Sequence, residues 1–506
     1  MKLACGLLAA AAFAQMPAPH LAKGQLLVDG KPFLVLGGEL HNTVSSDLEH
    51  MKTVWPELAQ AHLNTVLVGV GWNWIEPREG NFDFRIVDAA IDGARENHLR
   101  IVLLWFGSWK NGLSSFAPAW VKSDQKRFPR AQIRNGKTIE VLSTFSENNW
   151  QADARAFAAL LRHVKQVDTT HRVIMVQVEN EVGVLGDTRD RSPEADKAFA
   201  GAGVWKGFSG TRADEMFMAW SYARYINRVA DEGKREYALP MYVNAWIVQP
   251  EDKLPGDYPS GGPQAQNFDI WKANAPALDL LAPDIYLPDF PGIVEQYING
   301  RNLLFVPESF AGAQGAANAF FAIGARSAIG YSSFGIDTAM ENGAQRGPIA
   351  EAYDILGQLA PMILPAQANG KIAAVSLDKS LTSRRLRLGD YQLDVTLARS
   401  FRTPDALPDT IGYGLFIAAG PNEYYMAGNG IQVTFTPLAG GVASVAQQEA
   451  GRFENGKWVA TRQLGGDDSV LRYDIGNQAQ LGQSGTGVKF PAGKCGMQRV
   501  EVYRYQ

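Results

Sequence analysis

The sequence predicts an α/β fold, a (β/α)8 barrel followed by a C-terminal β-sandwich. Three observations favour it: the chain length, an alternation of apolar runs with amphipathic segments, and a change of pattern past Pro365. The chain has 506 residues, of which 46% are hydrophobic and 20% charged, as in a globular protein with a large core. At about 150 residues per domain, this length allows about three domains, and a barrel can occupy more than half of it as one unit.

Eight short apolar runs predict the strands of the barrel. Between them lie segments whose apolar residues share one helical face, such as Leu48, Met51, Trp55 and Leu58. Parallel strands covered by helices are short and mostly apolar, so eight such alternations favour a barrel. The runs are 33–40, 65–70, 101–105, 173–178, 241–245, 278–282, 303–306 and 328–332. A doubly wound sheet is the alternative, but the glycine-rich loop expected after its first strand is absent from the sequence.

The pattern divides the chain into a barrel at 25–365 and a β-sandwich at 370–506. In the second part, short alternating runs predict strands, and Glu454-Asn455-Gly456 predicts a turn. Two long insertions, 106–149 and 183–212, follow the third and fourth barrel strands. Loops in these positions form the active-site face of a barrel, although a surface insertion without function is an equal alternative.

Residues 1–14 are predicted to be a secretory signal. Lys2 precedes an apolar stretch, and Ala12-Phe13-Ala14 offers a cleavage site; a buried N-terminal helix is the alternative. Cleavage leaves Cys495 as the single cysteine and therefore no internal disulfide. We expect a bacterial periplasmic or secreted protein. No later apolar run reaches the roughly 20 residues that span a bilayer.

Charge and motifs argue against several function classes. The chain carries 48 Lys and Arg against 52 Asp and Glu, a net charge of −4, without the basic excess of a nucleic-acid binder. The seven histidines form no His-Glu-x-x-His pair, and no nucleophile elbow or phosphate-binding loop occurs. We expect no metal or organic cofactor, and the sequence leaves the oligomeric state open.

Two predicted strands end in acidic residues. The run Gln177-Val178-Glu179-Asn180-Glu181 ends the fourth strand, and Glu308 follows the seventh. Catalytic residues of barrels lie at C-terminal strand ends. Breaking an acetal requires a proton for the leaving oxygen and negative charge beside the developing oxocarbenium ion, and two carboxyls in different environments supply both. The two strand ends therefore predict a catalytic pair.

These motifs resemble glycoside hydrolase family 35, the β-galactosidase family, and the second-strand region is also similar to family 42. The resemblance implies that Glu181 is the proton donor, that Asn180 contacts the sugar 2-hydroxyl and that Glu308 is the nucleophile. His41 matches the first-strand histidine of the family. The other matching segments are Trp72-Asn73-Trp74-Ile75-Glu76-Pro77 and Pro118-Ala119-Trp120.

The chain departs from the family pattern at residues that help to hold galactose in typical members. Asn42 stands where a Tyr is usual, Gly107 and Ser108 where Ala-Glu is usual, and Val182 where a Tyr is frequent. The chemistry therefore carries over more securely than the sugar preference. The pattern suggests a divergent branch that acts on galactosyl side chains of plant polysaccharide.

Four further residues are expected to bind substrate. Tyr286 ends the sixth strand, where the resemblance implies a hydrogen bond to the nucleophile. Asn244 and Trp246 end the fifth strand and could bind hydroxyls or stack on a sugar ring, as could Trp109 in the third loop. Each is equally suited to core packing.

Two other acids have structural interpretations. Glu76 is expected to brace the barrel, and Glu179 to be buried and paired, or turned away from the substrate. The expected function is that of a retaining exo-β-galactosidase acting on oligo- or polysaccharides. The alternatives are a β-glycosidase for glucosides, fucosides or arabinosides, and a non-catalytic carbohydrate-binding barrel.

Overall fold

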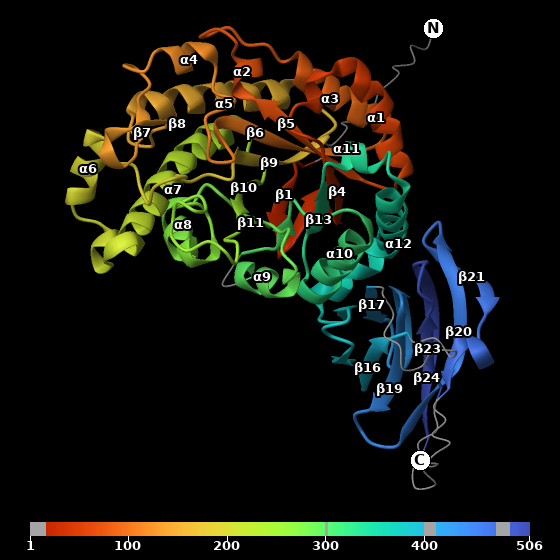
Figure 1. Ribbon diagram of the computed structural model, residues 1–506. Helices are drawn as coiled ribbons and strands as arrows, with labels where there is room; N and C mark the ends of the chain where they lie inside the picture. Colours follow the sequence, from red (N-terminus) through yellow and green to blue (C-terminus); the bar gives the residue numbers. More distant parts are fainter. Residues whose placement is uncertain (1–16, 299–301, 399–410, 472–485, 506) are drawn as a thin grey trace, which may run out of the picture.

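The structure, a computed structural model, describes residues 17–298, 302–398, 411–471 and 486–505. The predicted secretory signal at 1–14 lies outside the described residues. The described chain forms a barrel and, beside it, a pair of β-sheets (Figure 1). No helix in these ranges is both long and apolar enough to cross a membrane.

Eight parallel strands form the barrel, and each contains or overlaps one of the eight predicted runs. They are β4 (Val35–Glu39), β5 (Thr65–Gly71), β6 (Arg100–Lys110), β9 (Val173–Asn180), β10 (Met241–Trp246), β11 (Leu280–Asp284), β12 (Phe305–Val306) and β13 (Gly330–Phe334). Their order is β11-β10-β9-β6-β5-β4-β13-β12. The backbone N–H of Ile285 donates to the carbonyl of Glu308 at 2.9 Å, which closes the ring between β11 and β12. The predicted (β/α)8 barrel is confirmed.

Helices surround the strands on the outside (Figure 1). Those that cover the strands are α1 (Leu48–Gln60), α3 (Arg85–Glu96), α5 (Glu147–Val167), α7 (Gly210–Glu236), α8 (Phe268–Asn274), α9 (Phe290–Tyr297), α10 (Gly312–Arg326) and α12 (Gly343–Ala368). Short helices lie in the connections: α2 (Trp72–Ile75), α4 (Ala119–Ser123), α6 (Pro193–Ala200) and α11 (Ile336–Ala339). The first long insertion also carries a hairpin of β7 (Arg130–Gln132) and β8 (Thr138–Leu142).

A small N-terminal sheet closes the bottom of the barrel. It consists of β1 (His20–Ala22), β2 (Gln25–Val28) and β3 (Lys31–Phe33). Leu26 and Val28 are buried in one apolar cluster with inward residues of the barrel strands, among them Leu104 and Phe305. This packing fills the lower interior, so polar side chains at the strand ends gather at the opposite, C-terminal mouth.

The C-terminal region forms two antiparallel sheets, as predicted. The first has the order β14-β17-β18-β24-β20-β21 and the second β15-β16-β19-β23-β22. Their inner faces share one apolar core that includes Leu393 and Phe435 from one sheet and Phe416 and Val500 from the other. The strands are β14 (Ile372–Leu377), β15 (Ser383–Leu388), β16 (Tyr391–Leu397), β17 (Gly412–Ala418), β18 (Glu423–Asn429), β19 (Ile431–Pro437), β20 (Val442–Glu454), β21 (Lys457–Gln463), β22 (Ser469–Leu471), β23 (Thr486–Phe490) and β24 (Gly496–Tyr505).

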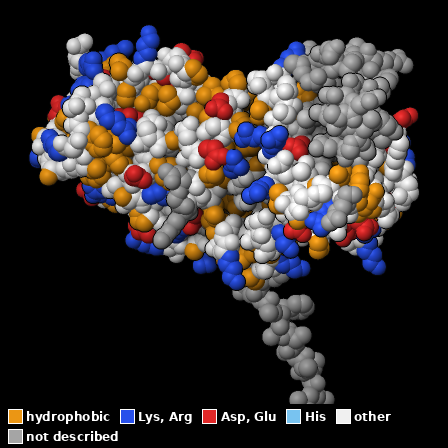
Figure 2. Space-filling view, turned by 90° about the horizontal axis from the view of Figure 1, so that it is seen from below, with side chains coloured by type: hydrophobic (Ala, Val, Ile, Leu, Met, Phe, Trp, Pro, Cys, Tyr) orange, Lys and Arg blue, Asp and Glu red, His pale blue; other side chains and the backbone are white. Residues whose placement is uncertain are grey.

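The first sheet packs against the barrel through α10. A Cβ added to Gly324 of this helix would lie 2.6 Å from the Cβ of Ala374 and 2.9 Å from Leu415 Cδ1, so glycine permits the close approach. Seen from below, acidic and basic side chains are interspersed over the barrel and the C-terminal sheets (Figure 2). This mixed surface agrees with the near balance of charges in the sequence.

Candidate active site

Glu181 and Glu308 meet at the C-terminal mouth of the barrel. Glu181 directly follows β9, Glu308 lies two residues after β12, and the two residues are 8% and 5% exposed. One oxygen from each, together with one from Asp284 at the end of β11, lie within 4.8 Å of one another. The carboxyls of retaining glycosidases are about 5–5.5 Å apart and those of inverting enzymes about 6.5–9.5 Å apart. The selected oxygens of Glu181 and Glu308 are thus closer to each other than the spacing of the inverting class.

The two carboxyls have different surroundings. Burial raises the pKa of Glu181 to about 8, and the charge of Glu308 acts in the same direction, against the opposing effects of Lys110 and Asp284. Glu181 therefore holds a proton at neutral pH. Glu308 instead faces hydrogen-bond donors: Tyr286 Oη lies 3.1 Å from its Oε2, and the amide nitrogen of Asn180 lies 3.5 Å from its Oε1. The site thus combines a proton donor with a carboxylate that accepts hydrogen bonds.

Asn244, which the sequence predicts to bind a sugar hydroxyl, contacts the acids of the site. Its side-chain oxygen accepts from the backbone N–H of Glu181 at 3.0 Å. Its amide nitrogen donates to Asp284 Oδ2 at 2.7 Å and lies 3.4 Å from Glu308 Oε1. Both ends of the amide therefore have partners within the site, and a contact of Asn244 with a sugar hydroxyl stays a prediction.

A backbone irregularity at the end of β9 separates Glu179 from Glu181. Both residues have positive φ, +63° and +46°, a conformation that is strained for residues other than glycine. It turns Glu179 toward the barrel wall, where it accepts hydrogen bonds from the backbone of Ser108 (3.1 Å) and Trp109 (2.7 Å). Burial, followed by the neighbouring Asp153, raises its pKa well above the ordinary value. The expectation that Glu179 is buried and paired is confirmed.

Trp109 is not placed where it could stack on a sugar. Its side chain has no exposed surface, its ring packs edge-on against Tyr222 and Tyr225, and its indole N–H donates to the carbonyl of Leu142 at 3.2 Å. The residue supports the wall behind Glu179. Sequence alone could not separate this role from stacking, because both require an aromatic side chain after the third strand.

The other predicted residues lie around the mouth. His41 is half-exposed, and its Nδ1 lies 3.0 Å from Asp337 Oδ2. Trp246 is partly buried at the end of β10. Asn180 is fully buried, and its side-chain oxygen is an acceptor without a hydrogen-bond partner among the described residues. Tyr286 is 37% exposed beside Glu308.

Glu76 braces the second-strand region, as expected. It is fully buried, accepts from the indole N–H of Trp72 at 2.9 Å, and accepts from the backbone of Gly80 at 2.8 Å. These bonds fix the turn after β5 outside the reacting centre.

Three charged residues of the site were missed from the sequence: Asp284, Glu39 and Lys110. Asp284 and Glu39 are the last residues of β11 and β4, and their place at C-terminal strand ends is the signal that could have found them. Glu39 is fully buried, and in the described ranges neither of its oxygens has a hydrogen-bond partner. Burial, then Glu308, raises its pKa well above the ordinary value.

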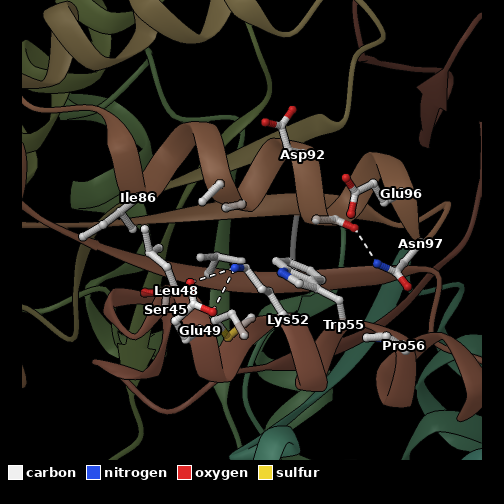
Figure 3. Close-up of a pocket in the computed structure, with 15 residues that line it drawn as sticks. Ser45, Leu48, Glu49, Lys52, Trp55, Pro56, Ile86, Asp92, Glu96 and Asn97 are labelled. Carbon is white, nitrogen blue, oxygen red and sulfur yellow. Dashed lines mark hydrogen bonds and ion pairs between the residues drawn. The ribbon is translucent and has the colours of Figure 1, made fainter.

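Glu181, Asp284 and Glu308 are also an acidic group whose oxygens are close enough to share a cation. A separate cavity of about 480 Å³ lies between α1 and α3 (Figure 3). Its polar groups pair locally: Lys52 with Glu49 at 2.7 Å, and the Asn97 amide with the Gly93 carbonyl at 2.9 Å. It contains none of the predicted site residues, which lie instead at the barrel mouth.

Residues 41–254 match the model of glycoside hydrolase family 42, described as β-galactosidase. Together, the closed barrel, the acids at its mouth and this match show a barrel that resembles those of glycoside hydrolases. The β-galactosidase resemblance is confirmed, and the match falls on the family that the sequence analysis placed second, after family 35. Residues 349–475 match a domain of unknown function, DUF5597.

Among individual proteins, the chain is similar to a β-galactosidase of Xanthomonas manihotis. The two are 29% identical over 174 residues, which cover 32% of this chain and 26% of the relative. The crystal structure of a β-galactosidase from Bacillus circulans sp. alkalophilus superposes with a TM-score of 0.50 at 15% identity, over 65% of this chain and 57% of that one. A β-galactosidase from Rahnella sp. R3 superposes with a TM-score of 0.48 at 14% identity, over 66% and 57%.

Proposed function

We propose that this protein is a retaining exo-β-galactosidase that releases terminal β-galactosyl residues from oligo- or polysaccharides. One observation carries the proposal: oxygens of Glu181 and Glu308 lie within 4.8 Å of each other, a spacing suited to direct attack by one carboxylate on the anomeric carbon.

In the first step, Glu308 attacks the anomeric carbon while Glu181 gives its proton to the departing glycosidic oxygen. The C–O bond to the leaving group breaks and an ester bond to Glu308 forms. In the second step, Glu181, now a carboxylate, takes a proton from water as that water attacks the same carbon and Glu308 leaves. Both residues thereby return to their starting states.

The exo mode is supported by the loops around the mouth. The loop after β9 is joined to the loop after β10 by paired backbone hydrogen bonds between Val184 and Ser260 (2.9 and 3.0 Å). The same loop reaches the first insertion through the N–H of Arg191 and the carbonyl of Gln132, at 2.7 Å. Loops linked in this way favour a walled pocket for a chain end over an open groove.

The galactoside preference rests on the β-galactosidase descriptions of the matching family and of the relatives. The alternative is the same chemistry on another β-linked sugar, which the departures from the family 35 pattern favour. A panel of aryl β-glycosides should give the highest kcat/KM with the galactoside. A higher value for the glucoside, fucoside or arabinoside would replace the sugar assignment.

The catalytic pair is tested by azide rescue. With a 2,4-dinitrophenyl β-galactoside, Glu181→Ala with azide should form β-galactosyl azide, and Glu308→Ala with azide should form the α-anomer. Glu308→Gln should abolish turnover with the fold intact, which circular dichroism would check. Substantial remaining activity of Glu308→Gln would remove this residue from the mechanism.

We also propose that the protein is exported, from the signal-like residues 1–14. N-terminal sequencing of the protein recovered from its bacterial host should begin at Gln15. A protein retained in the cytoplasm with residues 1–14 intact would contradict the proposal.

A further inference from the structure

Lys110 is placed in the mouth of the barrel by a tight turn. It is the last residue of β6, paired in register with Asn180 on β9, next to the acid Glu181. Asn111 and Gly112 follow with φ of +52° and +67°, and backbone hydrogen bonds of 2.8 and 3.1 Å join Lys110 to Leu113. Two successive residues at positive φ form the tightest hairpin turn, so the position of Lys110 is rigid.

The side chain of Lys110 extends inward. The residue is 6% exposed, and its ammonium lies 5.1 Å from the ring centre of Phe106, an inward residue of the barrel. Its charge opposes the rise in the pKa of Glu39, Glu181 and Asp284. The ammonium therefore faces the acidic cluster at the mouth.

No carboxylate in the described part of the chain lies within 4.0 Å of this ammonium, and no hydrogen bond from it to a described residue is formed. Its nitrogen is not among the fully buried polar atoms that lack a partner, so it keeps some contact with solvent and can donate to a bound ligand. The neighbouring Ser108 cannot serve a ligand in its place, because its hydroxyl lies 2.6 Å from Asp153 Oδ2 and 2.7 Å from the Tyr225 hydroxyl. Lys110 is thus the donor at the end of β6 that remains available to a bound sugar.

We propose that Lys110 is a specificity-determining residue that donates a hydrogen bond to one hydroxyl of the sugar held between Glu181 and Glu308. This inference rests on the proposed glycosidase function and adds to it one contact, between Lys110 and a sugar hydroxyl. The rigid turn allows the ammonium to reach one region of the ring, so a single hydroxyl should carry the effect.

The test compares wild type, Lys110→Met and Lys110→Arg on an aryl β-galactoside and on its 2-, 3-, 4- and 6-deoxy analogues. We expect Lys110→Met to lose at least tenfold in kcat/KM on the parent galactoside, mainly through KM. On one deoxy analogue, wild type and Lys110→Met should differ by less than threefold. Lys110→Arg keeps the charge and should recover part of the loss. Melting temperatures would show that each variant folds.

An equal loss on the parent and all four analogues would overturn the proposal, because it would mean that Lys110 acts only on the charges of the site. The absence of any loss would overturn it too. If wild type prefers another aryl glycoside, the deoxy series is built on that sugar. The galactose assignment would then fail, while the role of Lys110 would still be tested. If no glycoside is cleaved, calorimetric binding of galactose and its deoxy forms to wild type and Lys110→Met gives the same comparison.

Discussion

The hydroxyl of Tyr286 donates a hydrogen bond to Oε2 of Glu308 over 3.1 Å. Tyr286 follows β11 and Glu308 follows β12, the two strands between which the barrel closes. The ring of Tyr286 also meets Phe310 edge-on at 5.5 Å. Closure of the barrel therefore orients the carboxylate that we propose as the nucleophile.

Tyr286→Phe should lower kcat/KM on an aryl β-galactoside by about 10–100-fold. A hydrogen bond to a charged group is worth about 1.5–3 kcal/mol, and about 1.4 kcal/mol corresponds to tenfold in rate. Steady-state kinetics would measure the change, with Tyr503→Phe in the exposed part of β24 as the matched control. Equal rates for wild type and Tyr286→Phe would exclude a role for this bond.

The pH profile should report the proton on Glu181. Because its pKa is raised to about 8, kcat/KM on an alkyl β-galactoside should fall above about pH 8, approaching tenfold per pH unit. A dinitrophenyl galactoside, whose leaving group needs no proton, should not show this fall in its first step. A decline starting near pH 5 would show that Glu181 is not the acid.

Glu39→Gln should stabilise the folded protein at pH 8 and not at pH 4. The folded-state pKa of Glu39 is raised above its ordinary value, so wild type loses stability as pH rises from that ordinary value toward the folded one. Glutamine has no proton to lose and avoids this cost. Melting temperatures at the two pH values would measure the difference. A melting temperature of Glu39→Gln below that of wild type at pH 8 would contradict this expectation. As a control, Glu39→Ala should melt below wild type at both pH values, because it leaves a cavity.

Gly107→Ala should lower the free energy of unfolding by about 2–4 kcal/mol. The added methyl group would overpack the wall behind the site, where it meets buried acidic side chains. The added Cβ would lie 2.5 Å from Glu179 Oε1 and 2.8 Å from Asp153 Oδ1. Gly496→Ala, which like Gly107 lies in a strand without a positive φ but has open space around it, is the control for the loss of glycine alone. Chemical denaturation would compare the two, and a loss for Gly107→Ala no larger than that for Gly496→Ala would argue against close packing around Glu179.

The barrel strands could be predicted because strands buried on both faces are continuous apolar runs. The end of β6 was missed for the same reason. The predicted run stops at Trp105, whereas the strand continues through Gly107 and the polar residues Ser108 and Lys110, with a shift in register against β9. An irregular, partly polar strand end has no apolar pattern to detect, and Lys110 was overlooked with it.

The meeting of Glu181 and Glu308 could be predicted because the C-terminal ends of barrel strands gather at one mouth. The role of Asn244 could not, because it depends on which neighbours the closed ring brings to its amide. Trp109 shows the converse, since an aromatic residue beside an active site packs as readily into a wall as onto a sugar. Side-chain direction at strand ends depends on backbone irregularities such as the positive φ of Glu179.

The stereochemistry of hydrolysis tests the central claim most directly. Proton NMR of a fresh reaction on an aryl β-galactoside reports the first-formed anomer before mutarotation. The short separation of Glu181 and Glu308 predicts that β-galactose appears first and that the α-anomer follows slowly. α-Galactose as the first product would mean that water attacks directly, and that Glu308 does not form a bond to the sugar.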